Sequence, residues 1–464
     1  MKMRGRSRMK LTIQEIATAV SAKNQRLPLQ DVTITSVEFD TRKVTMGSLF
    51  VPLKGARDGH DFIDQAFKAG AVVTLSDREL DGSHPYLLVE DTLKAMQQLA
   101  VYYIKQIAPK VIGITGSNGK TTTKDMTSAV LSTTYKTYKT QGNFNNEIGM
   151  PYTMLAMPED TEMLVLEMGM DRRGDIELLS TLAQPDVAAI TMIGESHIEY
   201  LGSRQGIAEA KMEIVSGLKQ NGLLVVPNNE PLLQPLLPRD AATVRTFGLN
   251  PAADVSGTVM TEEKNKTVFT TTLGSGVSFE IPVLGAYNVS NALIALTIGN
   301  YFNVPMSSMT EALAHFDLTK NRTEWLETPA GLSILSDVYN ANPTAMTLVL
   351  DSFSSLETKG RKIIVLGDML ELGEQSEQMH TSIAPHVKEA SIQDVFLYGE
   401  SMSKLAPILI ETFEESRIHA FRKEEQEALM TVLEQTLEKG DTVFLKGSNG
   451  MGLQRIVDFL LKNC

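Results

Sequence analysis

The 464-residue chain contains a single cysteine, Cys464. An internal disulfide framework is therefore excluded, and this usage fits a reducing cytoplasm, so we expect a cytoplasmic protein. No run of about 18 apolar residues is present, and we expect no membrane-spanning helix. Basic residues are also scarce: 43 Lys and Arg stand against 56 Asp and Glu, a net charge of −13. This balance argues against a nucleic-acid partner, which would need a basic surface.

The start of the chain, MKMRGRSRMK, is basic but lacks the apolar core of a signal peptide. We interpret residues 1–9 as a disordered extension, with Met9 as an alternative start. The length predicts two to four domains. The pattern of expected strands and helices changes at about residues 90 and 318, which divides the chain into three blocks.

Each block has its own expected architecture. Residues 1–90 mix short strands and turns, with a strand at 32–39 and a helix at 61–70, and they predict a small α/β domain. Residues 91–318 open with a helix at 91–108 and then alternate apolar strands with helices, which is typical of a mostly parallel sheet covered on both faces. Residues 319–464 repeat this alternation and predict a Rossmann-like domain. Strands are expected at 111–115, 163–168, 187–193, 223–226, 332–336, 363–367, 395–398 and 442–446. The fold class is therefore α/β with three domains, the central one of the P-loop type.

A phosphate-binding loop is indicated by GITGSNGKTTTK at 113–124, between an apolar run and a helical pattern. Gly116 and Gly119 allow the backbone to wrap phosphates, Lys120 would reach the terminal ones, and Thr121 offers a hydroxyl to Mg²⁺. The spacing departs from GxxxxGK[ST], because Gly113 leads and Ile114 follows it. A Gly-Lys-Thr turn can also arise by chance in a long chain, but the flanking strand and helix favour the functional interpretation.

Two further polar residues follow neighbouring strand patterns. Glu167 ends an apolar strand, and His197 follows the next one. Ligands of parallel sheets bind beyond the carboxyl ends of the strands, so both residues should converge on the phosphate loop and could bind a cation. The alternatives are a strand-end carboxylate that reaches solvent and a histidine with a structural hydrogen bond.

Lys211 falls on the apolar face of a helical segment at 206–222, among Ile207, Ile214 and Leu218. A buried lysine tends to lose its charge, and a neutral amine can react with CO₂ to form a carbamate anion that could bind a cation. The alternative, a snorkelling or salt-bridged lysine, is favoured by periodicity alone.

Beyond these features the chain resembles the Mur ligases of peptidoglycan synthesis. The resemblance covers essentially everything after residue 9. It lies in TGSNGKTTTK at 115–124, GNFNNEIGMP at 142–151, LEMG at 166–169, the histidine segment at 194–203, AKMEI at 210–214, NVSNAL at 288–293, DVYNANP at 337–343, LGDMLELG at 366–373 and KGSNGM at 446–451. FDTRKVTMGSLFVPLKG at 39–55 and DGHDF at 58–62 resemble the family's uridine-nucleotide domain. DVYNANP is typical of the branch that adds D-alanyl-D-alanine. Two departures are MGMDRRGD at 168–175, where an Asn-His pair is expected, and Asn321 in place of a glycine before Arg322.

The resemblance implies ATP-dependent ligation of D-alanyl-D-alanine to UDP-MurNAc-tripeptide through an acyl phosphate, with Mg²⁺. It implies catalytic roles for Lys120, Glu167, His197 and Lys211. Thr121 and Glu167 would bind one Mg²⁺, and His197 with carbamylated Lys211 a second. The implied nucleotide-binding residues are Gly116, Ser117, Asn118, Gly119, Lys120, Thr121, Thr122, Asn288, Asn291, Arg322 and Asp337. The implied substrate-binding residues are Thr41, Arg42 and Lys54 at the uridine end, with Asn145 and Asn146 in the central channel. We expect a monomer.

Three rival functions remain open. A sister ligase that adds the third amino acid and a folylpolyglutamate-synthase-like ligase are both disfavoured by DVYNANP. A nucleotide sensor without ligase activity could dispense with Glu167, His197 and Lys211 together, and the chain retains all three.

Overall fold

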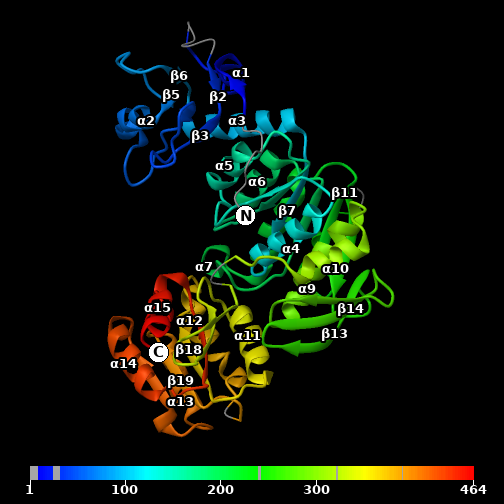
Figure 1. The fold of residues 1–464 in the computed structure, drawn as a ribbon, viewed down its shortest axis with the longest axis vertical. Helices are drawn as coiled ribbons and strands as arrows, with labels where there is room; N and C mark the ends of the chain where they lie inside the picture. Colours follow the sequence, from blue (N-terminus) through cyan, green and yellow to red (C-terminus); the bar gives the residue numbers. More distant parts are fainter. Residues whose placement is uncertain (1–8, 25–31, 239–241, 320–321, 389) are drawn as a thin grey trace.

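The computed structural model describes residues 9–24, 32–238, 242–319, 322–388 and 390–464. Most of the expected N-terminal extension, residues 1–8, lies outside this range, whereas Met9 is buried. Three lobes follow one another from the blue to the red end of the chain (Figure 1). Each of the three larger sheets lies within one of the three predicted blocks, while the boundaries at 90 and 318 stay a prediction.

The N-terminal lobe is built on a four-stranded parallel sheet in the order β3-β4-β5-β6. Its elements are α1 (Ile13–Ala19), β3 (Ser36–Glu38), β4 (Ser48–Phe50), α2 (Ile63–Ala69), β5 (Ala71–Ser76) and β6 (Tyr86–Leu88). A single strand at 32–39 was the wrong prediction. The segment splits into β2 (Thr33–Ile34), which pairs with β1 (Leu11–Thr12), and β3 of the larger sheet. The chain passes from one sheet to the other at Thr35. The Thr35 N–H donates to the carbonyl of Gly47, which immediately precedes β4 of the larger sheet.

The central lobe contains a nine-stranded sheet in the order β15-β14-β13-β12-β11-β10-β7-β9-β8. The predicted strands appear as β7 (Lys110–Thr115), β9 (Met163–Glu167), β10 (Val187–Ile190) and β11 (Gly222–Pro227). The sequence reading missed β8 (Thr137–Lys139), β12 (Ala242–Gly248), β13 (Val255–Glu263), β14 (Lys266–Thr271) and β15 (Ser278–Ile281). The last three pair antiparallel and extend the otherwise parallel sheet. The helices are α3 (Thr92–Ile107), α4 (Lys120–Ser132), α5 (Gly149–Ala156), α6 (Asp175–Ala183), α7 (Ile198–Leu201), α8 (Arg204–Met212), α9 (Ala286–Tyr301) and α10 (Met306–Ala314).

The helix expected over 206–222 is shorter than predicted. It ends as α8 at Met212, continues as a 3-10 turn over Glu213–Gly217, and Gly222 already begins β11. The chain turns there because Gly217 packs directly on the backbone of α6, where a Cβ would lie 2.0 Å from the Ser180 carbonyl oxygen. Helical periodicity alone does not register such a close approach of two backbones.

The C-terminal lobe has a six-stranded sheet in the order β16-β17-β21-β18-β19-β20, parallel except for the β16 edge. The strands are β16 (Glu324–Glu327), β17 (Ser333–Asp337), β18 (Lys362–Gly367), β19 (Asp394–Tyr398), β20 (Ile418–Phe421) and β21 (Thr442–Lys446). The helices are α11 (Pro343–Ser355), α12 (Ser376–Thr381), α13 (Ala406–Leu409), α14 (Gln426–Thr436) and α15 (Gln454–Asn463). The predicted Rossmann-like alternation is thus present.

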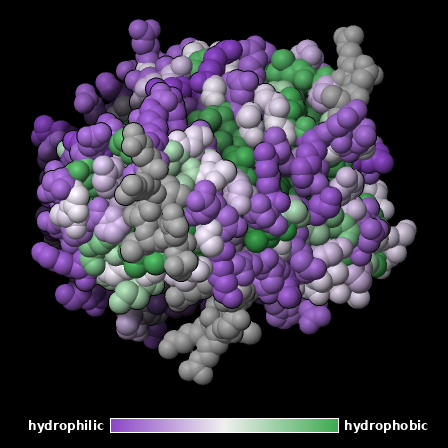
Figure 2. Space-filling view, turned by 90° about the horizontal axis from the view of Figure 1, so that it is seen from above, coloured by the Kyte–Doolittle hydropathy of each residue, from purple (hydrophilic) through white to green (hydrophobic). Residues whose placement is uncertain are grey.

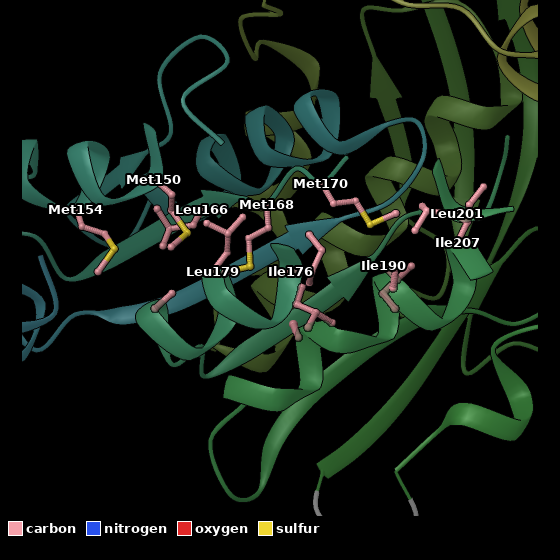
Figure 3. Close-up of a cluster of buried hydrophobic side chains, with 14 of the residues drawn as sticks. Met150, Met154, Leu166, Met168, Met170, Ile176, Leu179, Ile190, Leu201 and Ile207 are labelled. Atoms are coloured by element: carbon pink, nitrogen blue, oxygen red, sulfur yellow. The ribbon is translucent and has the colours of Figure 1, made fainter. Parts of the chain in front are cut away.

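Side-chain alternation along β9 decides where its polar end points. Leu164 and Leu166 belong to a cluster that also contains Met168, whereas Met163 and Val165 pack into the cluster on the opposite face. Figure 3 shows Leu166 and Met168 together with Met150, Met154 and Leu179 in an apolar layer. Successive strand side chains point to opposite faces, so Glu167 points away from this layer and towards α4.

Among the helices that the structure describes, none combines the length and apolar content needed to cross a bilayer. Seen from above, hydrophilic side chains dominate the surface, and apolar ones form small areas between them (Figure 2).

Candidate active site

The phosphate loop connects β7 to α4 and depends on two glycines with positive φ. Gly116 has φ +148° and Gly119 has φ +80°. A Cβ on Gly116 would lie 1.8 Å from Thr191 Oγ1, and one on Gly119 would lie 2.4 Å from Asn291 Oδ1. Both backbone conformation and space therefore require glycine. The Ser117 N–H donates to the Met192 carbonyl at 2.9 Å, which joins the loop to the segment after β10.

Lys120 lies folded against its own loop. Its Nζ donates to the Gly116 carbonyl at 2.8 Å and is 3.4 Å from the Ser117 carbonyl. Burial lowers the pKa of Lys120 to about 8; Glu167 opposes this shift and Arg322 adds to it. An anionic phosphate would favour the charged form of this amine, and the flexible side chain can exchange the two carbonyls for phosphate oxygens.

Glu167 is only 3% exposed, so the alternative of a carboxylate that reaches solvent is wrong. Asn145 Nδ2 donates to its Oε1 at 2.9 Å, whereas Oε2 has no hydrogen-bond partner within the described part of the chain. The buried Lys124 ammonium lies 3.8 Å from this Oε2 and 3.4 Å from Asp125 Oδ1. Asp125 in turn pairs with Lys139 at 2.6 Å. Sequence reasoning missed Lys124 and Asp125, because charged residues early in a helix normally face solvent.

The Glu167 Oε2 atom, which has the Lys124 ammonium at 3.8 Å but no hydrogen-bond donor among the described residues, is the observation that tests whether a cation fits here. A buried carboxylate oxygen without a donor is costly, and a bound cation would satisfy it. The described residues contain no cluster of three or more His, Cys, Asp or Glu side chains placed to bind a metal. Mg²⁺ is commonly bound by one or two protein oxygens together with substrate phosphates, so the donor set of Glu167 and the Thr121 hydroxyl fits this ion.

His197 precedes α7 and adopts the left-handed backbone conformation, with φ +61°. Its Nδ1 lies 2.7 Å from Glu371 Oε2 and 3.6 Å from Asp171 Oδ1. Burial lowers the pKa of His197, and Glu371 is the main group that opposes this shift. Glu371 belongs to the LGDMLELG segment of the C-terminal lobe, so this contact joins two lobes.

Lys211 is 1% exposed, so the snorkelling side chain that periodicity alone favoured is wrong, and the lysine is buried on the apolar face of its helix. Burial lowers the pKa of Lys211 well below its ordinary value; the Lys120 ammonium adds to this shift and Glu213 opposes it. An uncharged amine is the form that reacts with CO₂. Lys211 does not line the main cavity that the described residues form, although Lys120 and His197 are close enough to interact with it.

The main cavity lies between the central and C-terminal lobes and has a volume of about 740 Å³. The predicted residues that line it are Ser117, Asn118, Gly119, Lys120, Thr121, Asn145, Asn146, Glu167, His197 and Arg322. Tyr339, Asn340 and Glu371 complete the wall from the C-terminal side. Asn146 also accepts the Gly149 N–H at 2.9 Å, so it fixes the start of α5. The structure thus brings together side chains far apart in the sequence.

A second cavity of about 400 Å³ continues from the phosphate loop and shares Asn118, Gly119, Arg322 and Asn340 with the first. Its lining includes the predicted residues Thr122, Asn288, Asn291 and Asp337, together with Phe247, Tyr287 and Lys446. Asn291 Nδ2 donates to Asn288 Oδ1 at 3.0 Å, and Lys446 pairs with Asp337. The Arg322 guanidinium stacks 4.0 Å from the Tyr339 ring centroid. Aromatic walls beside a phosphate loop suit a nucleotide base.

The three residues expected at the uridine end lie in the N-terminal lobe. Thr41, Arg42 and Lys54 line a cavity of about 570 Å³. Arg42 pairs with Asp40 at 2.8 Å and holds the pKa of that carboxyl at about 2, while Lys54 pairs with Asp77 at 2.5 Å. The sequence reading missed Phe39, Arg57 and Phe62, which share the lining.

The fold and site define a class of protein: a multidomain α/β enzyme that binds a nucleotide on a central parallel sheet and encloses it with a Rossmann-like domain. Models of the "Mur ligase family, catalytic domain", the "Mur ligase middle domain" and the "Mur ligase, glutamate ligase domain" match residues 33–103, 114–299 and 321–449. The chain belongs to the Mur ligase family and is an ATP-dependent ligase.

Three relatives show the extent of the similarity. The UDP-N-acetylmuramoyl-tripeptide–D-alanyl-D-alanine ligase of Bacillus subtilis is 43% identical over 98% of this chain and 99% of its own length. A crystal structure of MurF from Acinetobacter baumannii is 27% identical, covers 98% of this chain and 100% of that one, and superposes with a TM-score of 0.88. A MurF ligase from Thermotoga maritima in complex with ADP is 28% identical over 92% of this chain and 97% of that one, with a TM-score of 0.79.

Proposed function

We propose that the protein ligates D-alanyl-D-alanine to UDP-MurNAc-tripeptide at the expense of ATP and gives UDP-MurNAc-pentapeptide, ADP and phosphate. The proposal rests on the 43% identity, over 98% of this chain, to the UDP-N-acetylmuramoyl-tripeptide–D-alanyl-D-alanine ligase of Bacillus subtilis. The cavity between the central and C-terminal lobes also supports it, because the tripeptide carboxylate, the dipeptide amine and the triphosphate of ATP all have to meet at one place.

The reaction follows from the chemistry of a carboxylate. The tripeptide's terminal carboxylate oxygen attacks the γ-phosphorus of ATP, and the bond to the β,γ-bridging oxygen breaks, which leaves an acyl phosphate and ADP. The amine of the dipeptide then attacks the acyl carbon, phosphate leaves, and the nitrogen loses a proton. A free carboxylate is unreactive towards an amine because it has no adequate leaving group, and phosphorylation supplies one.

Electrostatics assign roles to the residues of the loop. A carboxylate that approaches a triphosphate meets like charge, and Lys120 lies at the loop where it can neutralise part of that charge. Thr121 and Glu167 would hold Mg²⁺, which when bound supplies further positive charge beside the phosphates. Gly116, Ser117, Asn118, Gly119 and Thr122 would surround the phosphates, and Asn288, Asn291, Arg322 and Asp337 the nucleoside.

His197 and a carbamylated Lys211 would hold a second cation. What supports a carbamate is the burial of Lys211 and its lowered pKa, both of which favour the neutral amine. Carbamylation of Lys211 stays a prediction. At the substrate end, Thr41, Arg42 and Lys54 would contact the uridine diphosphate, and Asn145 and Asn146 the peptide. A monomer in the cytoplasm, where ATP is available, also stays a prediction.

The test is phosphate release by purified protein with ATP, Mg²⁺, UDP-MurNAc-tripeptide and D-alanyl-D-alanine, each omitted in turn. The proposal expects release only with all components, and a pentapeptide product by mass spectrometry. The two forms of tripeptide, with diaminopimelate or L-lysine as third residue, are assayed in parallel to identify the preferred one.

Two other outcomes would replace the proposal. Release with UDP-MurNAc-dipeptide and a free diamino acid would assign the chain to the sister ligase. Nucleotide binding without release for any acceptor would indicate a sensor.

A further inference from the structure

Asn342 of the DVYNANP segment is a fully buried amide, 1% exposed, at the start of α11. Its Nδ2 donates to Asn118 Oδ1 at 2.8 Å and to Ser196 Oγ at 2.8 Å. Its Oδ1 accepts the Ala345 N–H at 2.9 Å and the Asn118 Nδ2 at 3.2 Å. A side-chain amide has two donor hydrogens and two acceptor lone pairs, so Asn342 uses all four.

These bonds join two lobes at the phosphate loop. Asn118 lies within the loop, 224 residues from Asn342 in the sequence, and Ser196 immediately precedes His197. Ser196 Oγ in turn lies 3.3 Å from the Ser117 carbonyl of the same loop. Asn342 therefore bonds both the phosphate loop and the segment that carries His197, and α7 after that segment lies where the central and C-terminal lobes meet (Figure 1).

A neighbouring contact fixes the same element. The Thr344 N–H and hydroxyl donate to the two carboxylate oxygens of Glu195 at 3.0 and 2.9 Å. A carboxylate beside the first turn of a helix is favoured by the helix dipole, so Glu195 aligns the start of α11 against the central lobe. The amide of Asn342 is thereby held over Asn118.

We propose that Asn342 is a positioning residue that couples docking of the C-terminal lobe to the conformation of the phosphate loop. The inference deepens the proposed ligase function and rests on it for its kinetic predictions. With the lobe docked, the reciprocal amide pair orients Asn118, and with it the backbone between Gly116 and Gly119. With the lobe undocked, Asn118 and Ser196 lose these partners, and the loop is held only by contacts within the central lobe.

The geometry explains why asparagine is needed at this position. Aspartate has nearly the same shape but no donor, so Asn118 Oδ1 and Ser196 Oγ would face a carboxylate, and a negative charge would enter the phosphate site. Alanine would leave the half-buried Asn118 amide without both of its hydrogen bonds to Asn342. Either change should impair the docked state more than the binding of the uridine substrate, whose expected site lies in the other terminal lobe.

The experiment combines kinetics with a shape measurement. In Asn342→Asp and Asn342→Ala we expect kcat to fall at least about tenfold, which corresponds to about 1.4 kcal/mol of transition-state stabilisation. The KM for the uridine substrate should stay within about twofold, since a uniform loss of binding would raise KM instead. Ser355→Ala, at the exposed far end of α11, is the matched control and should behave like the wild type.

A double-mutant cycle tests the pair itself. If Asn118 and Asn342 act together, the double alanine variant should lose no more activity than the worse single variant. Additive losses would overturn the proposal, as would an Asn342→Asp enzyme with kcat within twofold of the wild type. If the Asn342 variants fail to fold, Asn118→Ala, which removes the reciprocal amide pair, and Ser196→Ala, which removes the Asn342 contact together with the one to the Ser117 carbonyl, must both show the kcat loss with an unchanged melting temperature.

Small-angle scattering with a non-hydrolysable ATP analogue separates this proposal from the proposed function. Wild-type protein should be more compact with the analogue than Asn342→Asp protein, whether or not any acceptor is ligated. Equal compaction of the two proteins would overturn the coupling. Absence of ligation with unequal compaction would leave the coupling intact and reject only the proposed reaction.

Discussion

The Nδ1 atom of His197 lies 2.7 Å from Oε2 of Glu371, and the two residues come from different lobes. Both adopt the left-handed backbone conformation, with φ of +61° and +62°. Non-glycine residues in this region cost free energy and persist where surrounding contacts determine them. A backbone bond from the Glu199 N–H to the Glu371 carbonyl at 3.2 Å supplies such a contact. The pair thus places a carboxylate of the C-terminal lobe at the wall of the main cavity.

Replacement of Glu371 by glutamine should reduce turnover. Carboxylates that orient a metal-binding histidine typically contribute about 10-fold to 100-fold in metal affinity or activity, and an amide oxygen, which carries no full negative charge, would interact with the imidazole more weakly. Steady-state assays over a range of Mg²⁺ concentrations measure the effect. Glu374→Gln, a nearby exposed carboxylate, is the control. Equal activity of the two variants would show that the His197 contact is incidental.

Nucleotide binding should depend on pH through Lys120. Its pKa of about 8 in the free protein means that the amine is charged below pH 8 and increasingly neutral above it. The bound triphosphate favours the charged form, so affinity should fall by up to about tenfold per pH unit above pH 8. Calorimetry at pH 8 in buffers of different ionisation enthalpy should detect uptake of up to about half a proton per nucleotide. Lys120→Arg, which stays charged, should abolish the pH dependence, and a flat wild-type profile would contradict the assignment.

Alanine at Gly119 should weaken nucleotide binding. The substitution combines the strain of φ +80° with a Cβ placed 2.4 Å from Asn291 Oδ1. Strain alone costs about 1–3 kcal/mol, which corresponds to roughly a 5-fold to 150-fold loss if the loop has to leave its binding conformation. Gly82→Ala is matched in backbone, with φ +86° and no heavy atom within 4 Å of the new Cβ. It should change stability but leave nucleotide affinity unaltered, and an equal loss in both variants would point to general destabilisation.

Lys211→Ala should abolish turnover while it leaves nucleotide binding largely intact. If the carbamate forms, removal of CO₂ should also reduce wild-type activity by about 10-fold or more, the scale expected for loss of a metal ligand's support, and bicarbonate should restore it. Lys211→Met fills most of the same buried space and shows whether lost activity merely reflects a cavity. Turnover like that of the wild type in Lys211→Ala, with bicarbonate varied, would refute the carbamate.

Local signals in the sequence predicted much of this fold. The phosphate loop has characteristic glycines, and the four central strands expected from apolar runs are all present, although β10 is shorter than its run. The helix expected over 91–108 is present as α3, and Asp91 caps it by accepting the Lys94 N–H at 2.8 Å. Helical periodicity placed Lys211 on an apolar face but did not decide that it is buried, and its helix ends ten residues before the predicted stop at Gly222.

Other features were beyond a sequence reading because they depend on approaches between distant segments. β13 to β15 are polar on one face and lack the apolar runs of buried parallel strands, so they passed unnoticed. Lys124 and Asp125 look like ordinary helix-surface charges until Glu167 and Lys139 are brought beside them. DVYNANP and LGDMLELG stood out as signatures, but no local pattern could assign Asn342 or Glu371 a partner.

The sequence by itself therefore determined the three-part α/β organisation, the phosphate loop and the residues able to bind phosphate or a cation. These properties depend on backbone propensity, side-chain periodicity and donor chemistry within a few residues. Only the tertiary structure decided that Asn118 pairs with Asn342 and His197 with Glu371, and that one oxygen of Glu167 has no hydrogen-bond donor among the described residues. Such contacts form only when residues far apart in the sequence pack together. The free energy that stabilises them therefore comes from the packing of the whole molecule and not from interactions within any one segment.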